Sequence, residues 1–167
     1  MNKYKVIAIC GKSASGKDTY LQQMLNHLGD KAHEIISHTT RPPREGEVDG
    51  KNYYFITEED FTTKLANNEM LEWATYRNWC YGTAIQALNK DKINIGVFNR
   101  KGIEFLSKRK DIDLFVILML AGGKTRLLRS LNREEFPDVD EIVWRYQADE
   151  EEWKEFKNFH FMLNNEG

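Results

Sequence analysis

Residues 4–17 read YKVIAICGKSASGK, and they carry the strongest structural signal of the chain. Its first seven residues, Tyr4–Cys10, are mostly apolar, as in a strand that is buried on both faces. The glycine-rich loop Gly11–Lys17 comes next, and apolar residues then recur at helical spacing as far as Gly29. The loop has the pattern G-x-x-x-x-G-K, in which backbone N–H groups and the positive end of the following helix bind phosphate. We therefore expect a phosphate-binding loop between a strand and a helix.

Strands and helices alternate along the rest of the chain. Apolar runs predict further strands at 33–37, 53–56, 70–76, 92–98, 114–120 and 159–163. Helical patterns lie at 84–88, 124–132 and 139–157, and a short helix begins near Thr57. This alternation predicts an α/β fold with a mainly parallel sheet flanked by helices. The pieces from 38 to 83 are shorter and more polar, which predicts an insert beside the main sheet.

Composition excludes several classes of protein. The 167 residues suit one domain, and the formal charge of −2 gives no overall basic field for nucleic acid or an anionic membrane. The apolar run Val6–Cys10 is too short for a signal peptide or a membrane span. Cys10 and Cys80 lack metal-ligand spacing, so we expect reduced thiols and a cytoplasmic protein.

A second pattern lies within the predicted insert. Residues 37–55 read SHTTRPPREGEVDGKNYYF, and LEWA at 71–74 and YGT at 81–83 follow. With the phosphate loop, these motifs resemble the guanylate kinase family of P-loop nucleoside monophosphate kinases, from residue 4 to about 165. The resemblance implies transfer of the γ-phosphate of ATP to GMP or dGMP, with Mg²⁺ as cofactor. It also implies a P-loop NTPase-type core (1–37, 84–122 and 139–167), a mixed α/β insert for GMP (38–83) and a helical lid (123–138).

The resemblance implies a GMP site with a chemical rationale. Its residues are Ser37, Arg41, Arg44, Tyr53, Glu72, Tyr81, Thr83 and Asn99. Guanine presents two neighbouring donors, N1–H and the 2-amino group, which an ionised Glu72 would accept, and O6 needs a donor such as Thr83 or Ser37. Adenine has the reverse pattern and would leave buried groups unpaired. Arg41 and Arg44 would bind the phosphate dianion, with the two tyrosine hydroxyls beside them.

The ATP site implied by the resemblance follows the loop. Its residues are Gly11, Ser13, Ala14, Ser15, Gly16, Lys17, Asp18, Thr19 and Asn165. Lys17 would reach the β- and γ-phosphates, and Asn165 would lie near adenine. Asp18 stands where Ser or Thr normally offers a hydroxyl to Mg²⁺. Its carboxylate either faces the metal or its waters, or it is an acidic residue favoured by the helix dipole.

Arginines and lysine are expected to carry the catalysis, because phosphoryl transfer to a phosphate oxygen needs no general base. The resemblance assigns this role to Lys17, Arg41, Arg44, Arg133 and Arg145. The spacing at Arg133 differs from the family by about a residue, so Arg126 or Arg129 could take its place. The alternative for Arg145 is a helix face of i, i+4 ion pairs.

One departure from the family pattern keeps other functions open. The family usually has the acidic pattern D-x-D-x-Q-G, whereas this chain has Val97 and Asn99 at the acidic positions, followed by Gly102. We expect Asp18 to restore one carboxylate near Mg²⁺. The alternatives are a ribose 1,5-bisphosphate kinase-like phosphotransferase and a non-catalytic guanylate kinase-like binding module. The expected partners are ATP and GMP or dGMP, without nucleic acid or membrane, and the expected assembly is a monomer or homodimer.

Overall fold

A computed structural model describes residues 3–166. Its strands and helices are β1 (Tyr4–Cys10), α1 (Lys17–Leu28), β2 (Ala32–Glu34), β3 (His38–Thr39), β4 (Tyr54–Phe55), α2 (Glu58–Ala66), β5 (Met70–Tyr76), β6 (Trp79–Ala84), β7 (Ile93–Val97), α3 (Arg100–Ser107), β8 (Ile112–Leu120), α4 (Gly123–Leu131), α5 (Val139–Glu152) and β9 (Phe161–Asn164). The main sheet has the order β2-β7-β1-β8-β9, and every neighbouring pair is parallel. The expected α/β fold with a mainly parallel sheet is confirmed.

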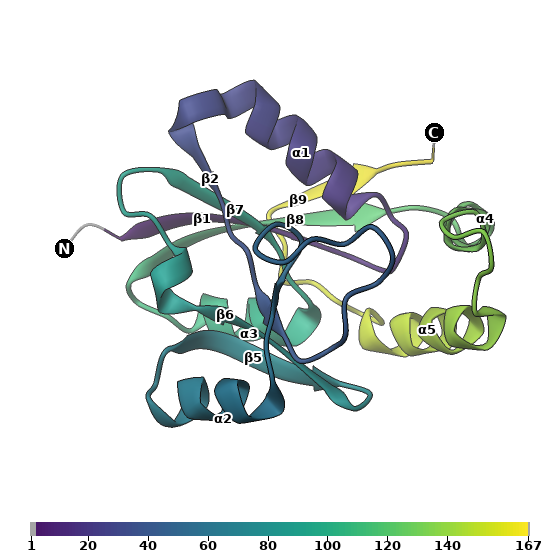
Figure 1. Ribbon diagram of the computed structural model, residues 1–167. Helices are drawn as coiled ribbons and strands as arrows, with labels where there is room; N and C mark the ends of the chain where they lie inside the picture. The colour runs from purple at the N-terminus through teal and green to yellow at the C-terminus, as the bar shows by residue number, and fades with distance from the viewer. Residues whose placement is uncertain (1–2, 167) are drawn as a thin grey trace.

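Helices cover both faces of the main sheet, with α1 on one side and α3 on the other (Figure 1). Side chains of β1 alternate between the two layers, since successive residues of a strand point to opposite faces. Val6 and Ala8 belong to the apolar cluster that contains Ile103 of α3. Ile9 belongs to the cluster that contains Leu21 of α1. The central strand is therefore buried on both faces, as its apolar sequence predicts.

The segment 38–84 forms a second sheet with the order β4-β3-β6-β5. It is mixed, because β3 pairs in parallel with β4 and antiparallel with β6. Strand β5 packs against α3, so this sheet lies on the α3 side of the main sheet, with α2 on its outer side (Figure 1). The segment between the predicted strands 33–37 and 92–98 thus forms a layer of its own.

Some elements differ from the sequence-based expectation. Helix α3 and strand β6, with eight and six residues, were not predicted. The last helix ends at Glu152 rather than at 157. Glu155 has a positive φ of 54°, and the turn there buries Trp153 and Phe156 in the core on the α3 side.

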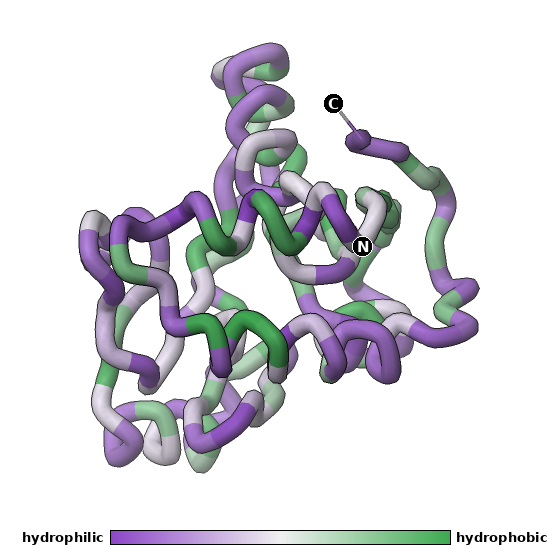
Figure 2. Tube along the Cα trace, turned by 90° about the vertical axis from the view of Figure 1, so that its right-hand side faces the viewer, coloured by the Kyte–Doolittle hydropathy of each residue, from purple (hydrophilic) through white to green (hydrophobic). Residues whose placement is uncertain are grey.

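The helices are amphipathic rather than uniformly apolar. Along the trace, hydrophilic and hydrophobic residues alternate at short intervals (Figure 2). Within residues 3–166, no helix is long and apolar enough to cross a membrane.

Candidate functional site

The phosphate loop joins the carboxyl end of β1 to α1, at the edge of the sheet where parallel α/β proteins bind ligands (Figure 1). Two glycines are required by its geometry. A Cβ on Gly11, whose φ is 138°, would lie 2.3 Å from the carbonyl oxygen of Met119, and Gly16 has a φ of 92°. Gly16 is also the N-cap of α1, and no side chain caps this helix end. The N–H groups of the first turn are therefore available to an anion.

Lys17 is held against the loop that precedes it. Its Nζ donates a hydrogen bond to the carbonyl oxygen of Lys12 at 2.8 Å. Burial lowers the pKa of Lys17, and the nearby carboxylates of Asp18 and Asp149 oppose this effect. Arg133 also lies close enough to lower this pKa. Bound phosphates would stabilise the charged form of Lys17 and offset the cost of its burial.

Helix α5 supplies carboxylates to the same loop. The backbone N–H of Ser13 donates to Oδ2 of Asp149 at 2.7 Å. Arg126, 3% exposed, pairs with Asp149 at 3.5 Å and with Glu150 at 2.6 Å. Glu150 also pairs with Lys12 at 2.6 Å. Sequence reasoning missed Asp149, since no short motif links residues 136 positions apart.

Asn165 contacts the loop from the end of β9. Its Nδ2 donates to the carbonyl oxygen of Ser15 at 3.0 Å, and its backbone N–H donates to the carbonyl oxygen of Leu120 at 2.7 Å. Arg129 donates to the carbonyl oxygens of Ala14 and Asn165. The structure therefore places Asn165 and Arg129 as supports of the loop. The expected contact of Asn165 with adenine stays a prediction.

Ser15 and Thr19, two further residues expected in the ATP site, differ in exposure. Ser15 is fully buried, and its Oγ has no hydrogen-bond partner within residues 3–166. Thr19 is exposed in the first turn of α1.

A cluster of three polar side chains, Ser37, Glu72 and Thr83, lies at the second sheet. Ser37 and Thr83 share a hydrogen bond of 2.9 Å between their hydroxyls. Glu72 of β5 is paired in register with Thr83 of β6 and is only 6% exposed. Burial raises the pKa of Glu72 to about 7, while hydrogen bonds from Thr83 act in the opposite direction. The structure thus brings together the three residues expected to recognise guanine.

Asn99 lies near this cluster and also has a structural role. It is the N-cap of α3, and its Oδ1 accepts a hydrogen bond from the N–H of Gly102 at 2.8 Å. A Cβ on Gly102 would lie 3.0 Å from Oε2 of Glu72 and 3.3 Å from Oδ1 of Asn99. The carboxylate of Glu72 and the amide oxygen of Asn99 therefore approach the same glycine. Val97 ends β7 and contributes no polar group.

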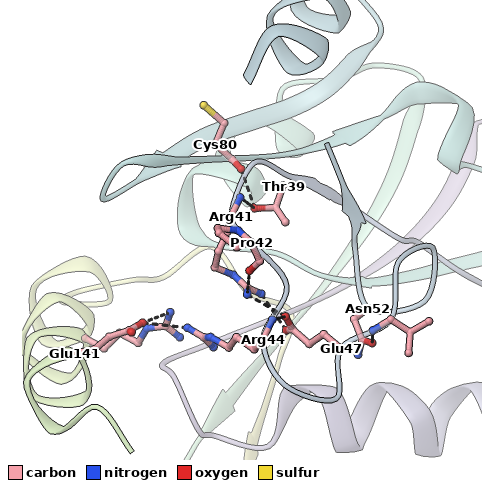
Figure 3. Close-up of polar contacts among 10 residues, drawn as sticks. Thr39, Arg41, Pro42, Arg44, Glu47, Asn52, Cys80 and Glu141 are labelled. Atoms are coloured by element: carbon pink, nitrogen blue, oxygen red, sulfur yellow. Dashed lines mark hydrogen bonds and ion pairs between the residues drawn. The ribbon is translucent and has the colours of Figure 1, made fainter. Parts of the chain in front are cut away.

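The insert also carries the arginines expected to bind phosphate. Arg41 donates to both carboxylate oxygens of Glu47 at 2.9 Å (Figure 3). Its guanidinium carbon lies 5.6 Å from the ring centroid of Tyr53, which in turn lies 6.0 Å from the ring of Tyr81. Burial raises the pKa of Tyr53 to about 12, so its hydroxyl stays protonated and able to donate. Sequence reasoning assigned no role to Glu47, although it lies within the quoted pattern.

Arg44 reaches from the insert to helix α5. Its Nη2 donates to Oε1 of Glu141 at 3.0 Å (Figure 3). Nη2 of Arg145 donates to the same oxygen at 3.0 Å. Burial lowers the pKa of Arg44, and the neighbouring charges of Arg145 and Arg41 lower it further. A cavity of about 330 Å³ lies at this point. Its wall includes Ser13, Ala14, Arg44, Arg126, Arg133, Glu141, Arg145 and Asp149. Ser13 and Ala14 of the phosphate loop therefore meet Arg44 of the insert and Arg145 of α5 at one cavity. Arg41 and Lys17 are not among the residues that line it.

The donor set near Asp18 is compatible with Mg²⁺. Asp18 is exposed in the first turn of α1, and its charge raises the pKa of both Tyr53 and Glu34. Residues 3–166 hold no group of three or more His, Cys, Asp or Glu side chains that could hold a metal by themselves. Mg²⁺ at nucleotide sites uses one or two carboxylates with phosphates and water, so one carboxylate beside the loop fits.

Comparisons with known proteins agree with this geometry. A family model described as guanylate kinase matches residues 3–167. A guanylate kinase of Malacoplasma penetrans is 32% identical over 160 residues, which cover 92% of this chain and 73% of that protein. One from Campylobacter jejuni is 28% identical over 165 residues, covering 96% and 80%. The crystal structure of a guanylate kinase from Anaplasma phagocytophilum has the same fold, with a TM-score of 0.68 and 21% identity over all of this chain and 79% of that one.

Proposed function

The chain belongs to the guanylate kinase family, and we propose on this basis that it transfers the γ-phosphate of ATP to GMP or dGMP, giving ADP and GDP or dGDP. One observation carries the choice of acceptor. The carboxylate of Glu72 is buried beside the hydroxyl of Thr83, which is hydrogen-bonded to that of Ser37. A buried carboxylate that keeps its charge needs donors, and guanine supplies two side by side.

Guanine recognition in this proposal uses all three residues of the cluster. Glu72 accepts from N1–H and the 2-amino group, and a hydroxyl of Ser37 or Thr83 donates to O6. The Asn99 side chain approaches the same glycine as Glu72 and lies on this side of the site. Adenine would place its N1 acceptor against the carboxylate, which would then lose its donors.

The phosphate of GMP is bound by Arg41 and Arg44, with Tyr53 and Tyr81 donating from one side. Arg41 sits in a fixed orientation because Glu47 accepts from two of its nitrogens. Its burial among aromatic rings leaves the guanidinium few other conformations. A fixed guanidinium binds an oxyanion with less loss of side-chain entropy than a mobile one.

Phosphoryl transfer then depends on alignment and on charge neutralisation. Lys17 holds the β- and γ-phosphates against the N–H groups at the start of α1. Arg44, Arg133 and Arg145 line the cavity where the two nucleotides meet. The acceptor is already a phosphate oxygen, so no side chain has to remove a proton. We propose that the insert (38–83) and the region 123–138 close over this cavity and exclude water from the reaction.

Mg²⁺ is the proposed cofactor, and Asp18 would hold it or its waters. When bound, the ion neutralises charge on the phosphate oxygens of ATP. Asp18 is well placed for this task because its carboxylate lies at the start of α1, beside Lys17 and within electrostatic range of Tyr53.

The two alternative functions fit the site less well. Ribose 1,5-bisphosphate has no nucleobase, so it would offer Glu72 no pair of neighbouring N–H donors. A non-catalytic binding module would not need a phosphate loop with Lys17 held against it and an uncapped helix end behind it. The direct test is product analysis with ATP, Mg²⁺ and GMP. GDP formed in equal amount to ADP supports the proposal, whereas ADP formed without GDP contradicts it.

A further inference from the structure

Three residues of α5 share one face of the helix and contact the insert. Glu141, Trp144 and Arg145 are spaced i, i+3 and i+4, which places them on neighbouring positions of one helix face. Glu141 bonds to Arg44, as described above. The ring of Trp144 packs edge-on against Tyr76 at 5.2 Å between centroids. The insert and α5 therefore touch at two points.

The first contact joins two cations through one carboxylate oxygen. Oε1 of Glu141 accepts from both Arg44 and Arg145, and the three side chains are 22–28% exposed. Arg145 lowers the pKa of Arg44, which shows that the two guanidinium groups repel each other. The negative charge of Glu141 lets them approach the same cavity.

Arg145 keeps a donor for a ligand within this arrangement. Its Nε is buried and has no hydrogen-bond partner within residues 3–166. A buried N–H without a partner is available to an acceptor such as a ligand oxygen. Glu141 uses only Nη2 of Arg145, so the ion pair and a bound phosphate do not compete for Nε.

The second contact holds the tip of the β5–β6 hairpin on α5. The guanidinium of Arg77 lies 4.1 Å from the ring centroid of Trp144, within the range of a cation–π interaction. Arg77 has a positive φ of 54°, an uncommon conformation for a residue with a side chain. Arg145 also approaches the ring of Tyr76, at 5.7 Å. The hairpin tip is therefore tied to the same helix face as Arg44.

We propose that Glu141 and Trp144 are positioning residues that join the GMP-binding insert to α5 and thereby set the position of Arg145 for phosphoryl transfer. This inference rests on the proposed guanylate kinase function. Closure of the insert over GMP then brings Arg44 to the cavity. Arg44 in turn fixes the position of Arg145, because both arginines bond to Glu141. Loss of either contact then lowers the rate of transfer more than it lowers the affinity for GMP alone.

The test compares Glu141→Gln and Trp144→Ala with Glu151→Gln, a change of the same kind at an exposed residue of α5. We expect Glu141→Gln to lower kcat by about tenfold to a hundredfold, since misplacement of a group by about 1 Å has effects of this size. The dissociation constant of GMP, measured calorimetrically without ATP, should change less than about threefold, as expected for a residue that acts on the transfer step. Glu141→Asp keeps the charge and should recover part of the lost kcat.

A second readout separates this inference from the proposed function. Hydrogen exchange of the protein without nucleotide should rise in 139–152 and around 41–47 in Glu141→Gln, and around 76–79 in Trp144→Ala. Unchanged exchange in these segments would refute the claim that the two contacts hold the insert on α5, whichever substrate the enzyme phosphorylates. An unchanged or increased kcat in Glu141→Gln overturns the positioning role. A wild-type protein that forms no GDP refutes the proposed function instead.

Discussion

Replacement of Glu72 by Gln should make the protein more stable and a poorer enzyme. Burial raises the pKa of Glu72 from 4.5 to about 7. In the unfolded chain the carboxyl group loses its proton near pH 4.5, so between pH 4.5 and 7 the folded protein binds more protons. Stability from this group therefore falls as the pH rises through that window and stays low above it.

The size of the effect follows from the shift in pKa. One pKa unit corresponds to about 1.4 kcal/mol, so ionisation of Glu72 costs the folded protein about 3 kcal/mol above pH 8. At pH 5 the cost is about 1 kcal/mol by the same relation. Gln has a similar shape without the charge. The gain in the free energy of unfolding on Glu72→Gln should therefore be about 2 kcal/mol larger at pH 8.5 than at pH 5.

Binding of GMP should change in the opposite direction. Gln can accept only one of the two guanine donors, and hydrogen bonds to a charged acceptor contribute about 1.5–3 kcal/mol each. We expect the KM for GMP to rise by about a hundredfold. In the wild type, the affinity for GMP should fall by about tenfold per pH unit below pH 7, because the carboxyl group must ionise to bind. Glu72→Gln should lose this part of the pH dependence.

The assays are urea unfolding at pH 5 and pH 8.5, and initial rates of GMP phosphorylation across the same range. Glu59→Gln, at an exposed residue of α2, is the matched control and should change stability by less than about 0.5 kcal/mol. A Glu72→Gln variant with an unchanged KM for GMP would refute the role of Glu72 in recognition. A loss of stability at pH 8.5 would refute the claim that its charge is costly.

Three further predictions concern the phosphate loop. Lys17→Ala should lower kcat by orders of magnitude while GMP still binds, because the proposed role of Lys17 is to hold the phosphates of ATP; near-normal turnover would contradict this. Asp18→Ser should change activity and its Mg²⁺ dependence, measured by titration of the metal, and an unchanged titration would remove Asp18 from the metal site. Asn165→Ala removes the hydrogen bond to the carbonyl oxygen of Ser15. It should raise the KM for ATP about tenfold with an unchanged KM for GMP; equal effects on both would point to general destabilisation.

The main sheet could be predicted because its central strand β1 is buried on both faces and its neighbours β7 and β8 are largely buried. Val6 and Ile9 of β1 point into two different apolar layers. Both faces of β1 therefore need apolar residues, and the resulting continuous apolar run is a strong local signal of a buried strand. Strand β6 and helix α3 gave no such signal. Gly82 is needed in β6 because a Cβ there would lie 2.9 Å from the backbone oxygen of Glu72, and this contact is visible only in three dimensions.

The candidate site divides in a similar way. Residues within short motifs, such as Glu72 and Arg41, could be found from the sequence because the residues around them form a recognisable pattern. Contacts between distant segments could not. Glu141 is 97 residues from Arg44, and Asp149 is 136 residues from Ser13. The i, i+4 spacing of Glu141 and Arg145 predicts an ion pair but gives no indication that Arg44 joins it.

The most direct test of the central claim is the choice of phosphoryl acceptor. ADP formation from ATP and Mg²⁺ is measured with GMP, dGMP, AMP, CMP, UMP and ribose 1,5-bisphosphate in turn. If guanine is recognised by Glu72, Ser37 and Thr83 as proposed, turnover occurs only with GMP and dGMP. Turnover with ribose 1,5-bisphosphate but not with GMP would contradict the proposed function. An absence of turnover with every acceptor would contradict it as well.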